Sequence, residues 1–119
     1  MSYDYLICRL PEGTSANPAF EEVEPTTPIG SLVHVKDVIA SIFPSVQWKE
    51  RKLPPVGHVV VGLGGPPEFQ FSPGADGLVA NIMMSRASAE EVRLLLRAIG
   101  CVALDLQAET VVSADPRTS

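Results

Sequence analysis

Two cysteines and two histidines could supply a nucleophile with its base, or a metal site: Cys8, Cys101, His34 and His58. A cysteine nucleophile needs a nearby base to form its thiolate, and zinc needs thiolates, imidazoles or carboxylates at ligand spacing. No Cys-x-x-Cys pair occurs, and both cysteines lie in runs with strand character, where buried thiols are common packing residues. We therefore expect no catalytic residue, no metal and no cofactor, and these residue types do not indicate an enzyme.

A glycine-rich segment, Gly62-x-Gly64-Gly65, follows an apolar run. Glycines at such spacing can bring backbone amides close to a phosphate, but a phosphate-binding loop must open a helix. Here Pro66 and Pro67 follow, and then an alternating run typical of a strand. The segment therefore predicts a hairpin turn rather than a nucleotide site.

Asp105 is the acidic residue with the most informative position. It lies in an apolar run, residues 102–106, where alternation places its carboxylate on the side of Cys101 and Ala103. Such a carboxylate is either exposed or paired, and the arginines that could pair with it are Arg9, Arg86 and Arg93. A structural pair or simple exposure is favoured over acid–base catalysis, because no second carboxylate is in register with it.

Trp48 stands in the only basic cluster of the chain, within residues 45–55. Together with Lys49, Arg51 and Lys52, the indole ring could contact an acidic partner. The alternative, which we favour, is a ring that caps the end of the core while the charges are solvated. A closing pair of prolines indicates that this segment is a loop or a short edge strand.

Three glutamates, Glu21, Glu22 and Glu24, are the acidic candidates for binding a partner. They lie in residues 11–30, a proline-rich segment with only isolated apolar residues, which predicts a long irregular loop. Such a loop either is functional or is merely mobile, and the polar composition favours mobility.

The elements that must position these side chains centre on residues 78–112. A buried strand at 78–84 precedes a helix at 88–100 and a second strand at 101–106. Ser88 and Glu91 have the spacing of a capping box, and Gly100 is a typical helix terminator. Residues 109–112 either extend the last strand or form a short edge.

The remaining patterns predict a strand at 3–10, a helix at 31–43, and strands at 57–63 and 68–72 that form a meander with the strand at 78–84. The chain order is then β-α-β-β-β-α-β. We expect an α+β fold, a two-layer sandwich with a mostly antiparallel sheet of about five strands and two helices on one face. Residues 1–112 would form one domain, and residues 113–119 a disordered tail.

Charge and hydropathy exclude several classes of partner. The chain has 119 residues, a formal net charge of −5 and no apolar run of the roughly 20 residues that a membrane span needs. An acidic chain is a poor ligand for nucleic-acid phosphates. Because no signal peptide is visible, we expect a cytoplasmic protein with neither nucleic acid nor membrane as partner.

Scattered residues give the chain a family resemblance. They are Met1 to Tyr5, Ile42-Phe43-Pro44 followed by Trp48, Glu68-Phe69, and Gly100 with Ala103, Asp105, Gln107 and Glu109. In these the chain resembles small, poorly characterised bacterial cytosolic proteins, some of which resemble immunity proteins of polymorphic-toxin systems. Members tend to carry an aromatic residue after the glycine, where this chain has Cys101. The resemblance implies a fold and a bacterial setting, and it carries no site.

Three functional hypotheses remain open. The first is a non-enzymatic protein-binding domain, such as an immunity-like inhibitor, that uses the acidic loop or an uncovered sheet face. The second is a small-molecule-binding protein or enzyme with a pocket between residues 11–30 and the sheet, involving Asp105, Arg86 and Trp48. The third is a structural homodimer that buries an open sheet face.

Overall fold

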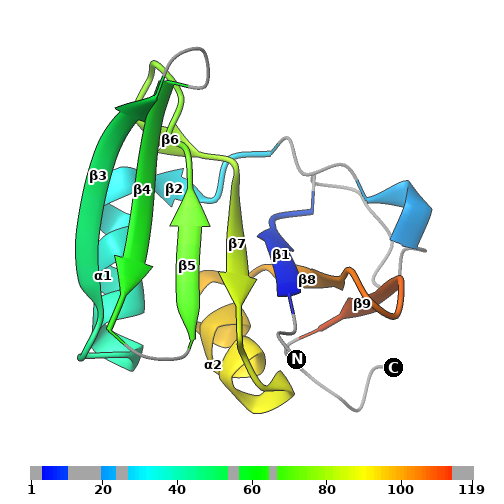
Figure 1. Ribbon diagram of the computed structural model, residues 1–119. Coiled ribbons are helices and arrows are strands. Elements are labelled where there is room, and N and C mark those ends of the chain that lie inside the picture. Colours follow the sequence, from blue (N-terminus) through cyan, green and yellow to red (C-terminus); the bar gives the residue numbers. More distant parts are fainter. Residues whose placement is uncertain (1–3, 11–19, 24–26, 54–56, 65–66, 114–119) are drawn as a thin grey trace.

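The computed structural model describes residues 4–10, 20–23, 27–53, 57–64 and 67–113 (Figure 1). Residues 114–119 of the expected tail (113–119), and residues 11–19 and 24–26 of the expected loop (11–30), lie outside these ranges. The elements, in chain order, are β1 (Asp4–Cys8), a 3₁₀ helix (Phe20–Glu22), β2 (Gly30–Ser31), α1 (Leu32–Ile42), β3 (Gln47–Leu53), β4 (Gly57–Leu63), β5 (Glu68–Phe71), β6 (Leu78–Val79), β7 (Asn81–Ser85), α2 (Ala89–Ile99), β8 (Val102–Asp105) and β9 (Thr110–Val112).

Helix α2 forms where its local signals predict it. The Ser88 hydroxyl accepts a hydrogen bond from the Glu91 amide at 3.2 Å, and the Glu91 carboxylate accepts one from the Ser88 amide at 2.9 Å. Gly100 ends the helix in the left-handed conformation, with φ 67°. The buried residues of the helix are Val92, Leu95, Leu96 and Ile99. The capping box and the apolar stripe are therefore both confirmed.

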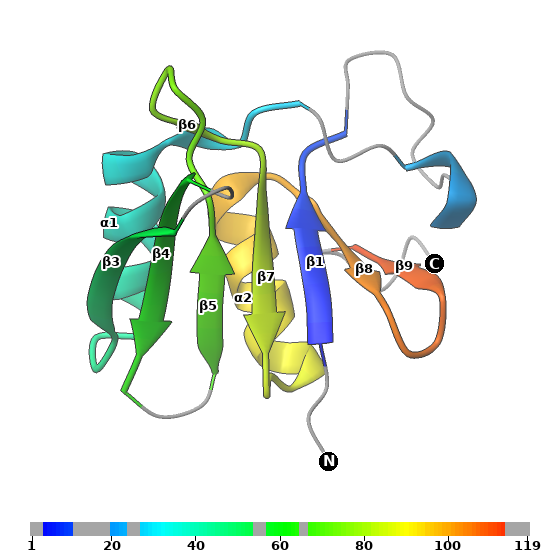
Figure 2. The same cartoon turned by 45° about the horizontal axis from the view of Figure 1, so that its top comes forward.

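Helix α1 is also confirmed, and its capping differs from that of α2. Ser31 accepts a hydrogen bond from the His34 amide at the N-terminus, and Phe43 is the C-terminal capping residue, directly before Pro44. Val35 and Ile39 are fully buried. Both helices lie on the same side of the sheet, and their apolar residues join one core with Phe69 and Met84 (Figures 1 and 2).

The sheet is antiparallel at every described pairing and has seven strands in the order β3-β4-β5-β7-β1-β8-β9. The α+β class with two helices is thus confirmed, and the expected count of about five strands is wrong. Segment 45–55, expected as a loop or short edge strand, contains the seven-residue edge strand β3, and β9 adds a further short edge. The expected strand at 78–84 is divided, because β6 leaves the main sheet to pair with β2.

Cross-strand pairing arranges side chains in rows that run over all seven strands. One row faces the helices and consists of Trp48, Gly62, Phe69, Met84, Tyr5, Asp105 and Thr110. The adjacent row faces the opposite side and consists of Lys49, Val61, Gln70, Met83, Leu6, Leu104 and Val111. These rows determine which predicted site residues can meet.

A second, smaller core covers one end of the face that lies away from the helices. Val23 packs there with Cys8 and Leu104, and Phe20 contributes to the same cluster. The 3₁₀ helix is seen beside β8 and β9 in Figure 2. The described parts of segment 11–30 are therefore packed, and that sheet face is covered at this end rather than open throughout.

No helix in the described part of the chain has both the length and the apolar character required to cross a bilayer.

Candidate functional site

The structure does not bring Trp48 and Asp105 into one site. They lie in the same row, but Trp48 is on β3 and Asp105 is on β8, five strand spacings away. At about 4.8 Å per spacing the separation is about 24 Å. Arg86 follows β7, and its guanidinium lies 4.0 Å from the Glu68 carboxylate at the surface. A single small ligand therefore cannot contact all three residues.

Asp105 stabilises the turn between β8 and β9. Its Oδ1 accepts hydrogen bonds from the backbone amides of Gln107 at 3.1 Å and Ala108 at 3.0 Å. The Asp105 carbonyl accepts a third from the Glu109 amide at 2.8 Å. The residue is 7% exposed. A buried carboxylate with two backbone donors is well suited to hold a turn.

Trp48 packs on the outer end of the helix-side core. Its ring meets Phe71 edge-on, with centroids 5.9 Å apart, and Lys36 Nζ lies 5.6 Å from the Trp48 ring centroid. Gly62, the partner of Trp48 on β4, leaves room for the indole, because a Cβ there would lie 2.8 Å from Trp48 Cζ3. The ring is thus part of the core edge.

Glu50 links helix α1 to the edge of the sheet. Its two carboxylate oxygens bind Lys36 Nζ at 2.9 Å and His58 Nε2 at 2.8 Å. The hydrogen bond from Lys36, and then that from His58, lower the pKa of Glu50 below its usual value of 4.5. Glu50 therefore remains ionised and has its charge locally balanced.

The opposite side of β3 presents two cations that have no such balance. Lys49 and Arg51 are exposed and point to the same side of the strand, two residues apart. Neither forms an ion pair within the described residues. Across β4, β5 and β7, the row of Lys49 continues with half-buried Val61, exposed Gln70 and half-buried Met83.

We call this surface the open half-face and define it as Lys49, Arg51, Val61, Gln70 and Met83. Its two half-buried apolar side chains, Val61 and Met83, are separated by exposed Gln70, and no described helix or strand lies over this face in Figure 2. The acidic candidates lie at the other end of the sheet, where Glu21 is exposed on the 3₁₀ helix that also contains Glu22. Glu24 is outside the described residues. The cationic candidates on β3 and the acidic candidates on the 3₁₀ helix therefore lie at opposite ends of the sheet (Figure 1).

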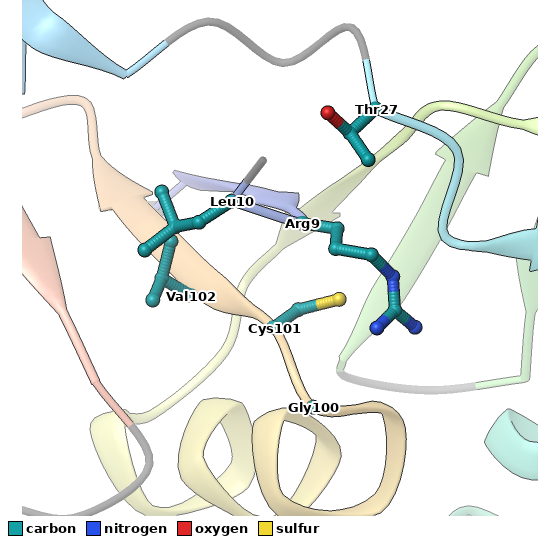
Figure 3. Close-up of a pocket in the computed structure, with 6 residues that line it drawn as sticks. All are labelled: Arg9, Leu10, Thr27, Gly100, Cys101 and Val102. Atoms are coloured by element: carbon teal, nitrogen blue, oxygen red, sulfur yellow. The ribbon is translucent and has the colours of Figure 1, made fainter. Parts of the chain in front are cut away.

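A cavity of about 400 Å³ lies where segment 11–30 returns to the sheet (Figure 3). Its described lining consists of Arg9, Leu10, Thr27, Gly100, Cys101 and Val102. The second hypothesis expected a pocket in this region, but Asp105, Arg86 and Trp48 are not among the described lining residues. In Figure 3, Leu10 and Val102 lie together on one side of the cavity, and the Arg9 guanidinium extends to the other.

Arg9 acts in this cavity as a clamp between three segments. Its Nη2 donates hydrogen bonds to the carbonyl of Ile29 at 3.0 Å and to the carbonyl of Ile99 at 2.9 Å. The second of these carbonyls belongs to the last residue of α2, where a cation complements the helix dipole. Arg9 thereby joins the end of β1, the segment before β2 and the end of α2.

The two thiols are poor nucleophiles at neutral pH. Burial raises the pKa of Cys8 and of Cys101 from 9.0 to about 11, and the charge of Arg9 only partly opposes this shift for Cys101. Cys101 also lies near the Ile99 carbonyl, with Sγ 3.6 Å from the oxygen. Both residues therefore remain protonated at neutral pH.

No protein-family model, curated protein or solved structure matches this chain. The resemblance to immunity proteins accordingly stays a prediction. Within the described residues, no group of three or more His, Cys, Asp or Glu side chains could hold a metal ion.

The sequence pattern identified Lys49 and Arg51 only as members of a basic cluster. It could not separate them from Lys52, because their common side depends on this segment being a strand. The Arg9 clamp was missed, since neither Ile29 nor Ile99 is near Arg9 in the chain. The available signal was a lone arginine near the end of a predicted apolar strand, which is too weak to assign a role.

Proposed function

We propose that this protein is a non-enzymatic protein-binding domain that docks an acidic protein surface on the open half-face. The proposal rests mainly on one observation, which is that Lys49 and Arg51 are exposed, unpaired among the described residues, and aligned beside half-buried Val61. The family resemblance suggests an inhibitor of the immunity type that acts in a bacterial cytoplasm.

The surface has the composition of a modest protein interface. Val61 and Met83 provide apolar contact area, exposed Gln70 lies between them in the row, and Lys49 and Arg51 lie beside them on the edge strand β3. Non-obligate protein interfaces combine apolar contact area with polar and charged groups. Two cations on a chain of net charge −5 are too few for a nucleic-acid backbone, so a protein with local carboxylates is the better partner.

The experiment is a capture assay from the source cell's lysate with the purified protein and two charge-reversed forms. Lys49→Glu combined with Arg51→Glu alters the open half-face. Lys52→Glu is the matched control, because Lys52 is exposed on the same strand and points to the other side. We expect one stoichiometric partner with the wild type and with Lys52→Glu, and its loss with the double variant.

Equal capture by all three forms would contradict docking on this face. A further variant, Glu21→Lys, tests the acidic loop. Loss of capture with this variant, and not with the double variant, would indicate that the interface lies on the acidic loop. Light scattering of the purified protein provides the remaining control, because a stable dimer of wild type would favour a structural homodimer.

A second candidate function is small-molecule binding in the cavity beside Arg9. The observation that favours it is the volume of about 400 Å³, which lies within the range of ligand pockets. A ligand there would shift the amide resonances of Leu10, Cys101 and Val102 in a saturable manner. A library that shifts none of them, at concentrations that saturate typical weak ligands, would reject this candidate.

A further inference from the structure

We infer that the partner adds an extended acidic segment as an antiparallel strand beside β3. The inference rests on the proposed function and specifies how the same partner is recognised. It places the new contact on the free edge of the sheet, with the neighbouring cations of the open half-face as its charge-selective part.

The geometry of the sheet edge at β3 favours strand addition. β3 is the terminal strand of the sheet, and all seven of its residues, Gln47–Leu53, pair with β4. In an antiparallel strand alternate N–H and C=O groups point away from the existing neighbour, so β3 offers a regular row of backbone groups that no other described segment pairs with. The other edge strand, β9, has three residues and is a much shorter template. Strand addition is a common mode of peptide recognition.

The charge of the β3 edge favours an acidic strand. The carboxylate of Glu50 is held by Lys36 and His58, so it contributes little negative field to the free side of β3. The remaining charged residues of the strand are Lys49, Arg51 and Lys52, and all three are exposed. Opposite charges directly across an antiparallel pair stabilise it. An incoming strand with carboxylates at alternate positions therefore matches Lys49 and Arg51.

A second copy of this chain is a poor partner for the β3 edge. In the full-length antiparallel register, β3 of one copy would place Lys49 against Arg51 of the other and Glu50 against Glu50. Like charges directly opposite are destabilising. The same cations that oppose self-pairing favour an acidic strand, which separates this partner from a homodimer.

The probe is a synthetic peptide of the length of β3 that alternates glutamate and threonine. Trp48 lies on β3 and is the only tryptophan of the chain, so its fluorescence reports on binding at this edge. We expect a saturable fluorescence change and slower hydrogen exchange at alternate amides of β3. A peptide with lysine for glutamate should bind at least about tenfold more weakly, because attraction becomes repulsion at two positions.

Two further forms separate the edge from the face. A glutamate peptide that is N-methylated at alternate amides keeps its charge but loses its ladder donors, so it should not bind. The Lys49→Glu, Arg51→Glu double variant should reverse the preference and select the lysine peptide.

Equal binding of the methylated and unmethylated peptides would overturn strand addition and leave docking on the open half-face intact. Absence of any fluorescence or exchange change with the glutamate peptide would also overturn it. The proposed function is judged separately by the capture assay, so strand addition can fail while docking on the open half-face stands.

Discussion

Trp48 and Asp105 belong to the same row of side chains on the helix-facing side of the sheet, and five strand spacings separate them. Both residues are binding candidates in the sequence, but their positions in the row give them unrelated structural roles. Trp48 closes the core beneath α1, and Asp105 holds the turn that returns β9 to the sheet. The surface proposed for binding lies on the other side of the sheet.

Removing the Asp105 side chain should destabilise the fold without affecting partner binding. Asp105→Ala leaves the amides of Gln107 and Ala108 without their acceptor, at a cost of about 1–3 kcal/mol in the free energy of unfolding. Urea denaturation measures this cost. Asp105→Asn is the control, because it retains an acceptor oxygen and should lose less. A larger loss with asparagine than with alanine would contradict the turn-stabilising role.

Arg9 should be far more important for stability than the exposed Arg86. Arg9→Met removes two charge-assisted hydrogen bonds to Ile29 and Ile99, and we expect the free energy of unfolding to fall by about 3 kcal/mol. Arg86→Met is the same substitution at a residue whose ion pair is 4.0 Å long and exposed, so the expected change is below about 0.5 kcal/mol. Similar losses in both variants would refute the clamp.

The buried thiols should make stability depend on alkaline pH. Cys8 and Cys101 have a folded pKa of about 11 against 9.0 for the free group, so between these values the folded state retains protons that the unfolded state releases. Their contribution is constant below about pH 9 and is lost as the pH rises toward about 11. Urea denaturation at each pH would measure the free energy of unfolding of the wild type and of a Cys8→Ala, Cys101→Ala double variant. If the free energy of unfolding changed with pH in the same way in both proteins, the thiols would not titrate as described.

The Glu50 carboxyl should titrate below its usual range because of Lys36 and His58. Its stabilising contribution is present above pH 4.5 and disappears as the pH falls through the lowered folded pKa. Carbon NMR of the carboxyl group measures the pKa directly. Lys36→Met should raise this pKa toward 4.5, and Lys49→Met, on the opposite side of β3, should leave it nearly unchanged. Equal effects of both variants would indicate a general charge effect.

Local signals predicted the helices well, and long-range pairing explains what they missed. Ser88, Glu91 and Gly100 specify α2 through contacts within one turn, so a reader of the sequence can identify it. The strand character of β3 comes from its ladder with β4, because its own residues are mostly charged. Phe20 and Val23 appeared as isolated apolar residues in a polar segment, and only the sheet beneath them gives them a core to enter.

The candidate site depended on information that the sequence does not contain locally. β1 lies between β7 and β8 in the sheet, although it comes first in the chain. Trp48 on β3 and Asp105 on β8 are therefore five strand spacings apart. The common orientation of Lys49 and Arg51 follows only once β3 is known to be a strand. The sequence shows the basic cluster, but it does not show to which side of the sheet each of its side chains points.

The most direct test of the account is the affinity of the captured partner for two proteins that differ only in the side of β3 that is altered. Titration calorimetry would compare Lys49→Glu with Lys52→Glu, each against wild type. We predict a clear loss of affinity, about fivefold or more, for Lys49→Glu and a change of less than about twofold for Lys52→Glu. Equal affinities for the two variants, or a larger loss with Lys52→Glu, would contradict docking on the open half-face.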